Sequence, residues 1–221
     1  MSLKFWWDPI SQPSRTVKYA LLRLGEEVDE KEVQIIKDTR TEEYKKEVNP
    51  AGKVPTLHFD DLKLYESATM LRFVLDHFQG EESLLPRSDL KARASVDYWL
   101  DWNNTTGRPA FVTALLKIKF LPKAFGAPEA TEEEAKELMN NVYNALSHLE
   151  TSLGDKSYLT GDNLSIGDVF VYNELYESKV VLEFDLEKYP KVAAWVGRIE
   201  EDEHIKTLNE GLLKRLAEVS S

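Results

Sequence analysis

The first eighty residues alternate between the two-residue period typical of strands and the period of about 3.6 residues typical of helices. Gly25 follows the first helical pattern directly, and Asp60-Asp61 separates the last two strand patterns, as is usual at element ends. Strands are predicted over 3–7, 28–36, 54–59 and 62–65, and helices over 13–24, 41–48 and 67–78. The predicted order is therefore β-α-β-α-β-β-α.

Beyond a segment over 80–88 that has the Gly, Ser, Pro and charged residues of a linker, the pattern becomes helical. Ser165-Ile-Gly-Asp168 fits a variant of the capping box that begins a helix. Further helices are predicted over 89–120 with interruptions at Gly107 and Pro109, over 131–153, from Pro190 onward and over 205–219, with a loop over 122–128. The predicted fold is α/β plus all-α, with domains over 1–80 and 89–221.

Charge supports this division and narrows the range of partners. The chain of 221 residues carries a net charge of −11. Residues 1–80 hold 12 basic and 14 acidic side chains, so most of the excess acid lies in the helical part. An acidic protein is repelled by nucleic acid and by anionic membranes, so neither is an expected partner. No apolar stretch resembles a signal peptide or a membrane span, and a cytoplasmic location is expected.

The sequence lacks the residues that several kinds of site chemistry require. With zero cysteines, the chain offers no disulfide, no thiolate metal site and no catalytic cysteine. The phosphate-binding motifs GxxxxGKS/T and GxGxxG and the nucleophile motif GxSxG are absent. The histidines, at 58, 77, 148 and 204, have no metal-ligand spacing and are predicted to be structural or at the surface. No metal is expected.

The segment Ser11-Gln-Pro-Ser-Arg15 connects the first strand to the first helix. Pro13 suits the opening turn of a helix, so Ser11 is expected just outside a helix N-terminus, where free N–H groups and the helix dipole favour an anion. A hydroxyl there can donate to a bound thiolate, and each unit by which it lowers the thiol pKa requires about 1.4 kcal/mol. The alternative is that Ser11 is only an N-cap, the commoner role of serine at this position.

Two further segments at element ends suggest ligand contacts. In Asn49–Leu57, a cis Val54–Pro55 bond would turn the backbone of Val54 outward, where it could pair with a peptide-like ligand. The alternative is an ordinary trans proline, because only about 5% of X–Pro bonds are cis. In Tyr65-Glu66-Ser67-Ala68, Ser67 at a helix N-terminus can hold a carboxylate and Glu66 an amine. The alternative there is a serine N-cap beside an acidic residue.

Taken together, the order and spacing of these motifs resemble those of the cytosolic glutathione transferases. The resemblance rests on SQPSR, NPAGKVPTL, YESATMLRFV, DLKARASVDYWLDW and SIGDV, and it spans almost the whole chain. Within the family the chain is most similar to the serine-type, theta-like enzymes. The first strand offers Trp6 and Trp7 but no tyrosine, which disfavours the tyrosine classes, and the absence of cysteine excludes the cysteine classes.

The resemblance implies a thioredoxin-like domain that binds glutathione as co-substrate, a helical domain that shapes a hydrophobic acceptor site, and a homodimer. It implies conjugation of the glutathione thiol to hydrophobic electrophiles, as in detoxification, with peroxide reduction or dehalogenation as possible side activities. The resemblance implies that Ser11 activates the thiol and that Val54, before the cis-proline Pro55, pairs through its backbone with the cysteinyl unit. It implies that Glu66 and Ser67 bind the γ-glutamyl amine and carboxylate. It also implies that Arg40 and Lys53 bind the glycine carboxylate. The alternative function is a non-catalytic binding or scaffold protein with the same fold.

The chain departs from the family pattern in two places. Related enzymes often have an acidic residue in the fourth helix that reaches the partner subunit's glutathione; here the segment over 103–105 reads Asn-Asn-Thr and Arg108 follows. The long C-terminal extension that covers the site in animal theta enzymes is also absent, so an open acceptor site is expected. Phe111, Leu115 and Phe120 are candidate lining residues, and core packing is the alternative for each.

Overall fold

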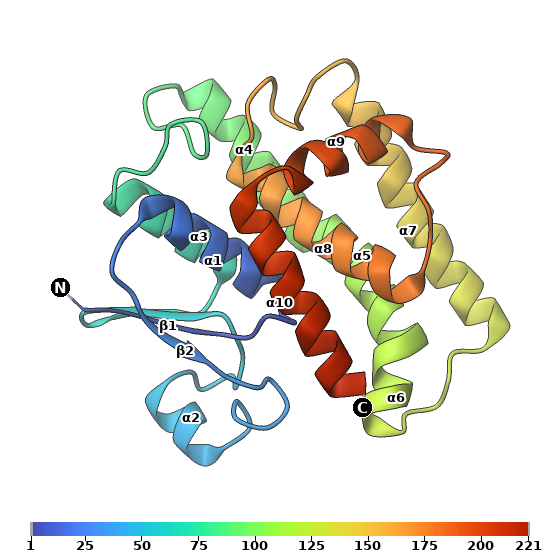
Figure 1. The fold of residues 1–221 in the computed structure, drawn as a ribbon, viewed down its shortest axis with the longest axis horizontal. Helices are drawn as coiled ribbons and strands as arrows, with labels where there is room; N and C mark the ends of the chain where they lie inside the picture. Colours follow the sequence, from blue (N-terminus) through green and yellow to red (C-terminus); the bar gives the residue numbers. More distant parts are fainter. Residues whose placement is uncertain (1, 221) are drawn as a thin grey trace.

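The computed structural model describes residues 2–220, and its N-terminal part is built on a four-stranded mixed sheet (Figure 1). The strands are β1 Leu3–Trp7, β2 Asp29–Glu32, β3 Thr56–Phe59 and β4 Leu62–Leu64, in the spatial order β2-β1-β3-β4. β2 runs parallel to β1, whereas β3 is antiparallel to both β1 and β4. Phe5 and Leu57 pair across the centre of the sheet and are fully buried, which fixes the register.

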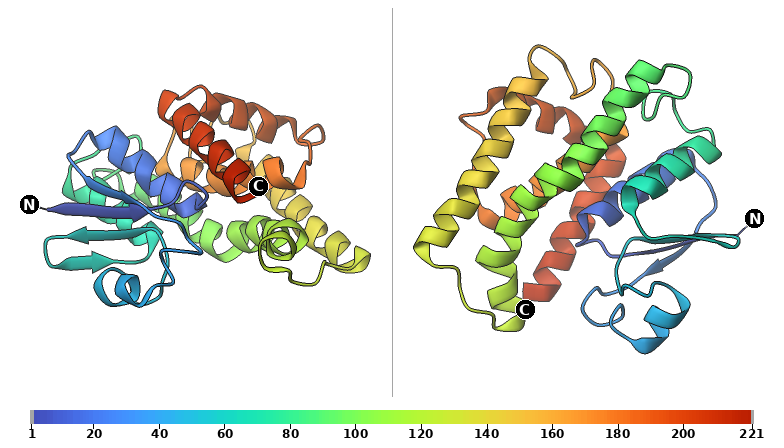
Figure 2. Two further views of the ribbon diagram at one scale, coloured as in Figure 1. Left: turned by 60° about the horizontal axis from the view of Figure 1, so that its bottom comes forward. Right: turned by 180° about the vertical axis from the view of Figure 1, so that it is seen from behind.

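Three helices complete this part: α1 Gln12–Leu24, α2 Glu42–Glu47 and α3 Ser67–His77. α1 and α3 pack side by side on one side of the sheet, and α2 lies on the other side (Figures 1 and 2). Gly25 ends α1 in the left-handed conformation, at φ 67°, and Thr41 caps α2. The order β1-α1-β2-α2-β3-β4-α3 confirms the predicted thioredoxin-like arrangement.

The predicted strand over 28–36 is too long, because β2 ends at Glu32. β1 offers no partner beyond Trp7, whose carbonyl oxygen accepts the last ladder bond from Val33 N at 2.9 Å. The chain then turns around Asp8, whose Oδ2 accepts a hydrogen bond from Ile35 N at 3.0 Å. A buried carboxylate thus replaces a neighbouring strand as the partner of this backbone.

The helical part begins with one long, continuous helix instead of the interrupted one predicted over 89–120. It comprises α4 Leu90–Trp102, α5 Arg108–Leu115 and α6 Leu121–Phe125, joined by π-helical segments over 103–107 and 116–120. In the first of these wider turns, Arg108 N donates to the carbonyl oxygen of Asn103. Pro109 and Pro122 each follow such a turn, so their missing N–H groups fall where the regular ladder is already altered. The predicted loop over 122–128 is accordingly wrong as far as Phe125.

The remaining helices are α7 Glu132–Leu153, α8 Ile166–Leu182, α9 Pro190–Glu200 and α10 Glu203–Ser220. The predicted capping box at Ser165 and Asp168 begins α8, and Thr131 with Glu134 forms a second one at α7. Helix α8 is buried along most of its length and packs against α1, α4 and α5 (Figure 1). It therefore joins the sheet-containing part to the helical part. No helix within residues 2–220 is long and apolar enough to cross a membrane.

Candidate active site between the sheet and the helical domain

A cavity of about 450 Å³ lies where the end of β1 and the start of α1 face the helical domain. One wall is formed by residues 8, 10–12, 34–37 and 52–54 of the N-terminal domain, and the other by residues 108, 112, 115, 116, 120, 177, 215, 218 and 219. Its size falls within the usual range for a small-molecule site. Of the predicted site residues it brings together Ser11, Lys53 and Val54.

Ser11 is the N-cap of α1 and also lines this cavity, so the two roles considered for it are compatible. Its Oγ accepts a hydrogen bond from Ser14 N at 3.3 Å, and its side chain is largely buried. Because the oxygen acts as acceptor in the cap, the hydroxyl proton stays available to a group in the cavity. Pro13 occupies the first turn, as predicted. An anion beside Ser11 also faces the positive end of the α1 dipole.

The Val54–Pro55 bond is cis, and Pro55 is buried. The preceding carbonyl oxygen, of Lys53, accepts hydrogen bonds from Tyr44 Oη at 2.9 Å and from Asn49 Nδ2 at 3.0 Å, which hold the loop. Within residues 2–220, no hydrogen bond uses the backbone N–H or C=O of Val54. Pairing of these groups with a bound peptide stays a prediction.

The other predicted ligand residues lie beyond the wall of this cavity. Glu66 is the N-cap residue of α3 but makes no side-chain capping bond, and Ser67 is the first residue of the helix. The alternative reading of Ser67 as a serine N-cap is therefore wrong. Glu66 and Arg40 are exposed, and Ser67 is half-buried. Their proposed contacts with a ligand stay predictions.

The candidate acceptor residues separate into two groups. Leu115 and Phe120 line the cavity. Phe111 does not: it is fully buried, and its carbonyl oxygen accepts a hydrogen bond from Ser178 Oγ at 3.0 Å, so its alternative role in the core is the correct one. Sequence reasoning missed Ile36 and Val112, which also line the cavity. Ile36 had been assigned to the overlong second strand, and Val112 follows the same helical period as its core neighbours.

A buried ionic cluster supports the segment that carries Ser11. Arg15 is fully buried and donates from Nη1 to the carbonyl oxygen of Pro9 at 2.7 Å and to Glu177 Oε2 at 2.9 Å. Its Nη2 and Nε donate to the carbonyl oxygen and Oδ1 of Asn173 at 3.1 and 3.3 Å. Burial raises the pKa of the Glu177 carboxyl to about 7, and Arg15 opposes that rise. Helix α8 thus fixes the loop before α1.

A second buried glutamate holds Arg108 at the cavity. Arg108 Nη1 donates to Glu174 Oε1 at 2.7 Å and makes a longer hydrogen bond of 3.4 Å to Gln12 Oε1. Glu174 is fully buried, and burial raises the pKa of its carboxyl while Arg108 opposes that rise. The sequence showed no local signal for either glutamate, because their partners lie more than sixty residues away along the chain.

The last turns of α10 close one end of the cavity. Arg215 pairs with Asp8 at 3.3 Å, with Glu218 at 3.0 Å, and with Glu32. Asp8 in turn accepts hydrogen bonds from Ile10 N and Ile35 N, so one carboxylate organises three segments of the wall. The acceptor side, expected to be open, is bordered here by helix α10.

The histidines and acidic runs show no arrangement typical of a metal site. His58 Nε2 lies 3.0 Å from the carbonyl oxygen of Val48, and the ring packs on Trp6 with centroids 4.6 Å apart, which is a structural role as predicted. Across residues 2–220, no three His, Asp or Glu side chains converge as metal ligands do.

Comparison with known proteins places these features in a family. Residues 8–82 match the model of the glutathione S-transferase N-terminal domain, and residues 109–203 match that of the C-terminal domain. The chain is 32% identical over 202 residues to human glutathione S-transferase theta-2B, covering 90% of this chain and 81% of that protein. It is 28% identical over 217 residues to the dichloromethane dehalogenase of Methylorubrum extorquens, covering 95% and 75%.

A similar solved structure is the human theta-class glutathione transferase in complex with the glutathione conjugate of 1-menaphthyl sulfate. It has a TM-score of 0.89 and 29% identity, over 100% of this chain and 91% of that one. The apo form of human glutathione S-transferase T1-1 also has a TM-score of 0.89, at 28% identity, over 96% and 90% of the two chains. Both family models together cover most of the chain, and it belongs to the glutathione S-transferase family as a theta-like member.

Proposed function

We propose that this protein is a glutathione transferase that joins the thiol sulfur of glutathione to hydrophobic electrophiles. The observation that carries the proposal is the cavity in which Ser11, at the N-terminus of α1, faces an apolar wall from α5 and the π-helical segment after it. Its relatives support the same conclusion, because they are named as theta glutathione S-transferases and one was solved with a glutathione conjugate.

Glutathione is the proposed co-substrate, and its parts match the groups around the cavity. The unpaired backbone of Val54 suits the cysteinyl unit, while Lys53 and Arg40 supply positive charge for the glycine carboxylate. Lys37, which also lines the cavity, adds a cation that the sequence did not single out. The N-terminus of α3, with Ser67 and Glu66, suits the γ-glutamyl carboxylate and amine. A tripeptide with a net negative charge thus finds cations near one end and a helix N-terminus near the other.

Ser11 is proposed to stabilise the glutathione thiolate. Its hydroxyl donates to the sulfur while its oxygen keeps the cap bond to Ser14 N, and the α1 dipole favours the same negative charge. The thiol proton leaves to solvent. The thiolate then forms a carbon–sulfur bond to the electrophile, whose leaving group departs with the electron pair of the broken bond. Val112, Leu115 and Leu116 would hold the apolar part of the electrophile.

The test combines binding and ionisation in one sample. Calorimetry measures glutathione binding, and the ultraviolet absorbance of the thiolate gives the thiol pKa of the bound tripeptide. We expect a pKa below that of free glutathione, and Ser11→Ala should restore the free value while glutathione still binds. Ser14→Ala is the matched control, because it makes the same change in the same helix at a side chain that does not line the cavity. An unshifted pKa in the unmodified protein would favour a non-catalytic binding protein, and unchanged turnover in Ser11→Ala would exclude the role of Ser11.

Family membership also leads us to propose a homodimer and a cytoplasmic location. Sedimentation velocity at several protein concentrations tests the first, and fractionation of the source cells tests the second. A monomer at all concentrations would refute the dimer.

A further inference from the structure

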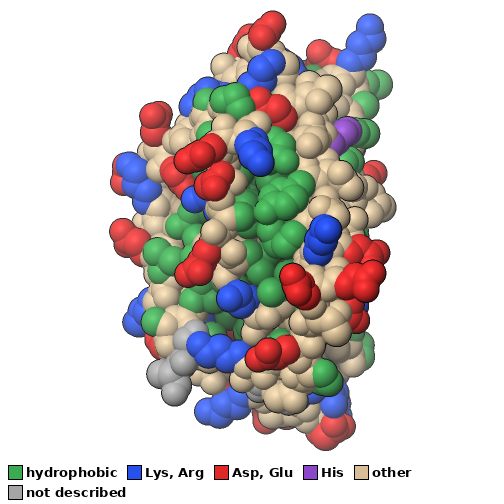
Figure 3. Space-filling model, turned by 90° about the vertical axis from the view of Figure 1, so that its right-hand side faces the viewer, with side chains coloured by type: hydrophobic (Ala, Val, Ile, Leu, Met, Phe, Trp, Pro, Cys, Tyr) green, Lys and Arg blue, Asp and Glu red, His purple; other side chains and the backbone are tan. Residues whose placement is uncertain are grey.

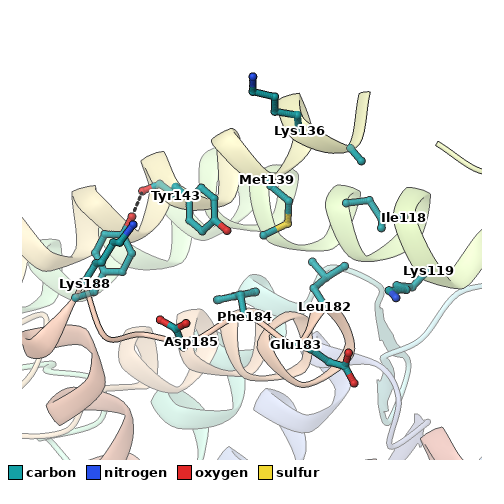
Figure 4. A pocket seen from close by; sticks show the side chains of 12 residues that line it. Ile118, Lys119, Lys136, Met139, Tyr143, Leu182, Glu183, Phe184, Asp185 and Lys188 are labelled. Atoms are coloured by element: carbon teal, nitrogen blue, oxygen red, sulfur yellow. Dashed lines mark hydrogen bonds between the residues drawn. The ribbon is translucent and has the colours of Figure 1, made fainter. Parts of the chain in front are cut away.

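A second cavity, of about 680 Å³, lies between α7 and the end of α8 (Figure 4). It shares no lining residue with the cavity beside Ser11. Its two carboxylates, of Glu183 and Asp185, are exposed, and Figure 3 shows this side of the molecule with charged side chains of both signs around a hydrophobic patch. The cavity beside Ser11 differs, because one carboxylate in its wall, that of Glu177, is almost fully enclosed.

Among the described residues, three acidic ones line the cavity beside Ser11, and two of them are engaged in other contacts. Asp8 accepts two backbone hydrogen bonds and pairs with Arg215. Glu218 pairs with the same arginine and is exposed. The side chain of Glu177 is 3% exposed, and within residues 2–220 its carboxylate accepts a hydrogen bond only at Oε2. One oxygen of this enclosed carboxylate is therefore available to a molecule in the cavity.

Arg15 holds this carboxylate against the loop that carries Ser11. One nitrogen of its guanidinium, Nη1, donates both to Glu177 Oε2 at 2.9 Å and to the carbonyl oxygen of Pro9 at 2.7 Å. Two acceptors of one NH₂ group lie close together, and Pro9 precedes Ser11 by two residues. Glu177 is thus fixed, on the buried helix α8, in the wall beside the proposed position of the glutathione sulfur.

The charged groups that face Glu177 come from three helices. Arg15 of α1 and Arg108 of α5 are the cations, and Glu174, one turn earlier on α8, is a second anion. Burial raises the pKa of the Glu177 carboxyl to about 7, the two arginines oppose that rise, and Glu174 adds to it. The carboxyl therefore exchanges its proton near neutral pH, as an efficient proton acceptor does.

The charge balance of this cluster favours moving a proton to Glu177 when the sulfur ionises. The two arginines and two glutamates together carry no net charge, so a proton added to Glu177 leaves one positive charge beside the new thiolate. If the proton went directly to solvent, the thiolate would form beside an ionised Glu177. Two such anions repel one another strongly in an enclosed site.

We propose that Glu177 accepts the thiol proton of bound glutathione and passes it to solvent at the mouth of the cavity. The S–H bond breaks, its electron pair stays on the sulfur beside Ser11, and an O–H bond forms at Glu177. Loss of that proton to solvent restores the carboxylate before the next turnover. This inference rests on the proposed transferase activity, and it adds a proton acceptor to the thiolate-stabilising role of Ser11.

Stopped-flow mixing with glutathione, followed by the ultraviolet absorbance of the thiolate, measures how fast the bound thiol ionises. In the unmodified protein the forward rate constant should rise with pH and level off above about 7, as Glu177 becomes ionised. Glu177→Gln keeps an acceptor for Arg15 but takes up no proton in this range, and we expect ionisation to be at least about tenfold slower. The equilibrium pKa of the bound thiol should not rise, because the variant removes a neighbouring negative charge.

Glu200→Gln is the matched control, because it makes the same change at a partly buried glutamate, on α9, that does not line the cavity. It should leave the rate of ionisation unchanged. Glu177→Asp keeps a carboxylate at the site and should ionise the thiol faster than Glu177→Gln does.

Three results would overturn the proposal. The first is an unchanged rate of ionisation in a folded Glu177→Gln variant. The second is a thiol pKa raised toward that of free glutathione in this variant, which would show that Glu177 acts only through Arg15 and the position of Ser11. The third, which needs no variant, is a forward rate constant that stays the same on both sides of about pH 7 in the unmodified protein.

Failure of the proposed transferase activity gives a different result. If the unmodified protein binds glutathione without forming the thiolate, both proposals are refuted. If the thiolate forms at the same rate with and without Glu177, only the role of Glu177 is refuted.

Discussion

Replacing Arg15 should destabilise this protein far more than replacing its buried ionic partner, Glu177. Arg15 is fully buried and makes four hydrogen bonds, to Pro9, Asn173 and Glu177. Three of these go to uncharged acceptors, at about 1 kcal/mol each, and the one to a carboxylate contributes about 1.5–3 kcal/mol. Arg15→Met removes all four hydrogen bonds and should lower the free energy of unfolding by about 4.5–6 kcal/mol. That is a large part of the ~5–15 kcal/mol typical of a folded domain.

Glu177→Gln is expected to cost about 1 kcal/mol or less at pH 7.5. The glutamine oxygen still accepts the hydrogen bond from Arg15 Nη1. The raised pKa of Glu177, about 7, also means that burial already disfavours its charged form. Arg15→Lys should fall between the two, because one ammonium group keeps the charge but cannot reach Pro9, Asn173 and Glu177 together.

Equilibrium unfolding in urea, followed by tryptophan fluorescence at two protein concentrations, measures these differences and detects any linked subunit dissociation. A Glu177→Gln variant as unstable as Arg15→Met would show that ionic attraction, and not the hydrogen bonds, holds the loop. A loss below about 1.5 kcal/mol in Arg15→Met would refute the role of Arg15 altogether. The thiol pKa of bound glutathione in Arg15→Lys gives a separate readout of how well the loop presents Ser11.

Other parts of the structure lead to further predictions. Asp168→Ala should lower the free energy of unfolding in urea by about 3–5 kcal/mol, because the Asp168 carboxylate accepts hydrogen bonds from the buried Leu159 N, Ser165 N and Trp195 Nε1. Asp168→Asn keeps one of the two oxygens and should lower the free energy of unfolding by about half as much. Gly167→Ala should cost about 1–3 kcal/mol and lower the melting temperature, since a Cβ there would lie 2.9 Å from Cβ of Trp99. Because the folded-state pKa of Glu177 is raised, its contribution to stability is largest at acid pH and is lost as the pH rises through about 7. The free energy of unfolding should fall by up to ~1.4 kcal/mol per pH unit over this range. A pH series of unfolding curves should show a weaker dependence of the free energy of unfolding on pH in Glu177→Gln.

The elements that follow local rules were predictable from the sequence. Ser165 and Asp168 form the expected capping box, Gly25 ends α1, and the helix predicted from Pro190 onward is α9. Ser11 was placed correctly for the same reason, since Pro13 fixes where its helix begins. Such signals involve residues within a few positions of one another.

The errors arose where distant residues decide the local structure. Asp8 captures the backbone of Ile35 and so shortens β2, which no pattern within residues 28–36 reveals. The π-helical turn before Pro109 keeps the long helix continuous, because packing against α7 and α8 outweighs the local preference to stop. Phe111 and Leu115 share one helical period and are both buried, yet only Leu115 also lines the cavity, a difference that the period does not reveal.

The candidate site therefore depends on both domains, not on the N-terminal one alone. Ser11 belongs to the N-terminal domain, yet the loop before it is held by Arg15 through Glu177 and Asn173 of α8. On the far side, Arg215 of α10 pairs with Asp8, the carboxylate that also shapes the turn at Ile35. Both ties reach the same few residues between β1 and α1. The N-terminal domain separated from its helices would keep the residues of the glutathione motif but lose the contacts that aim Ser11 into the cavity.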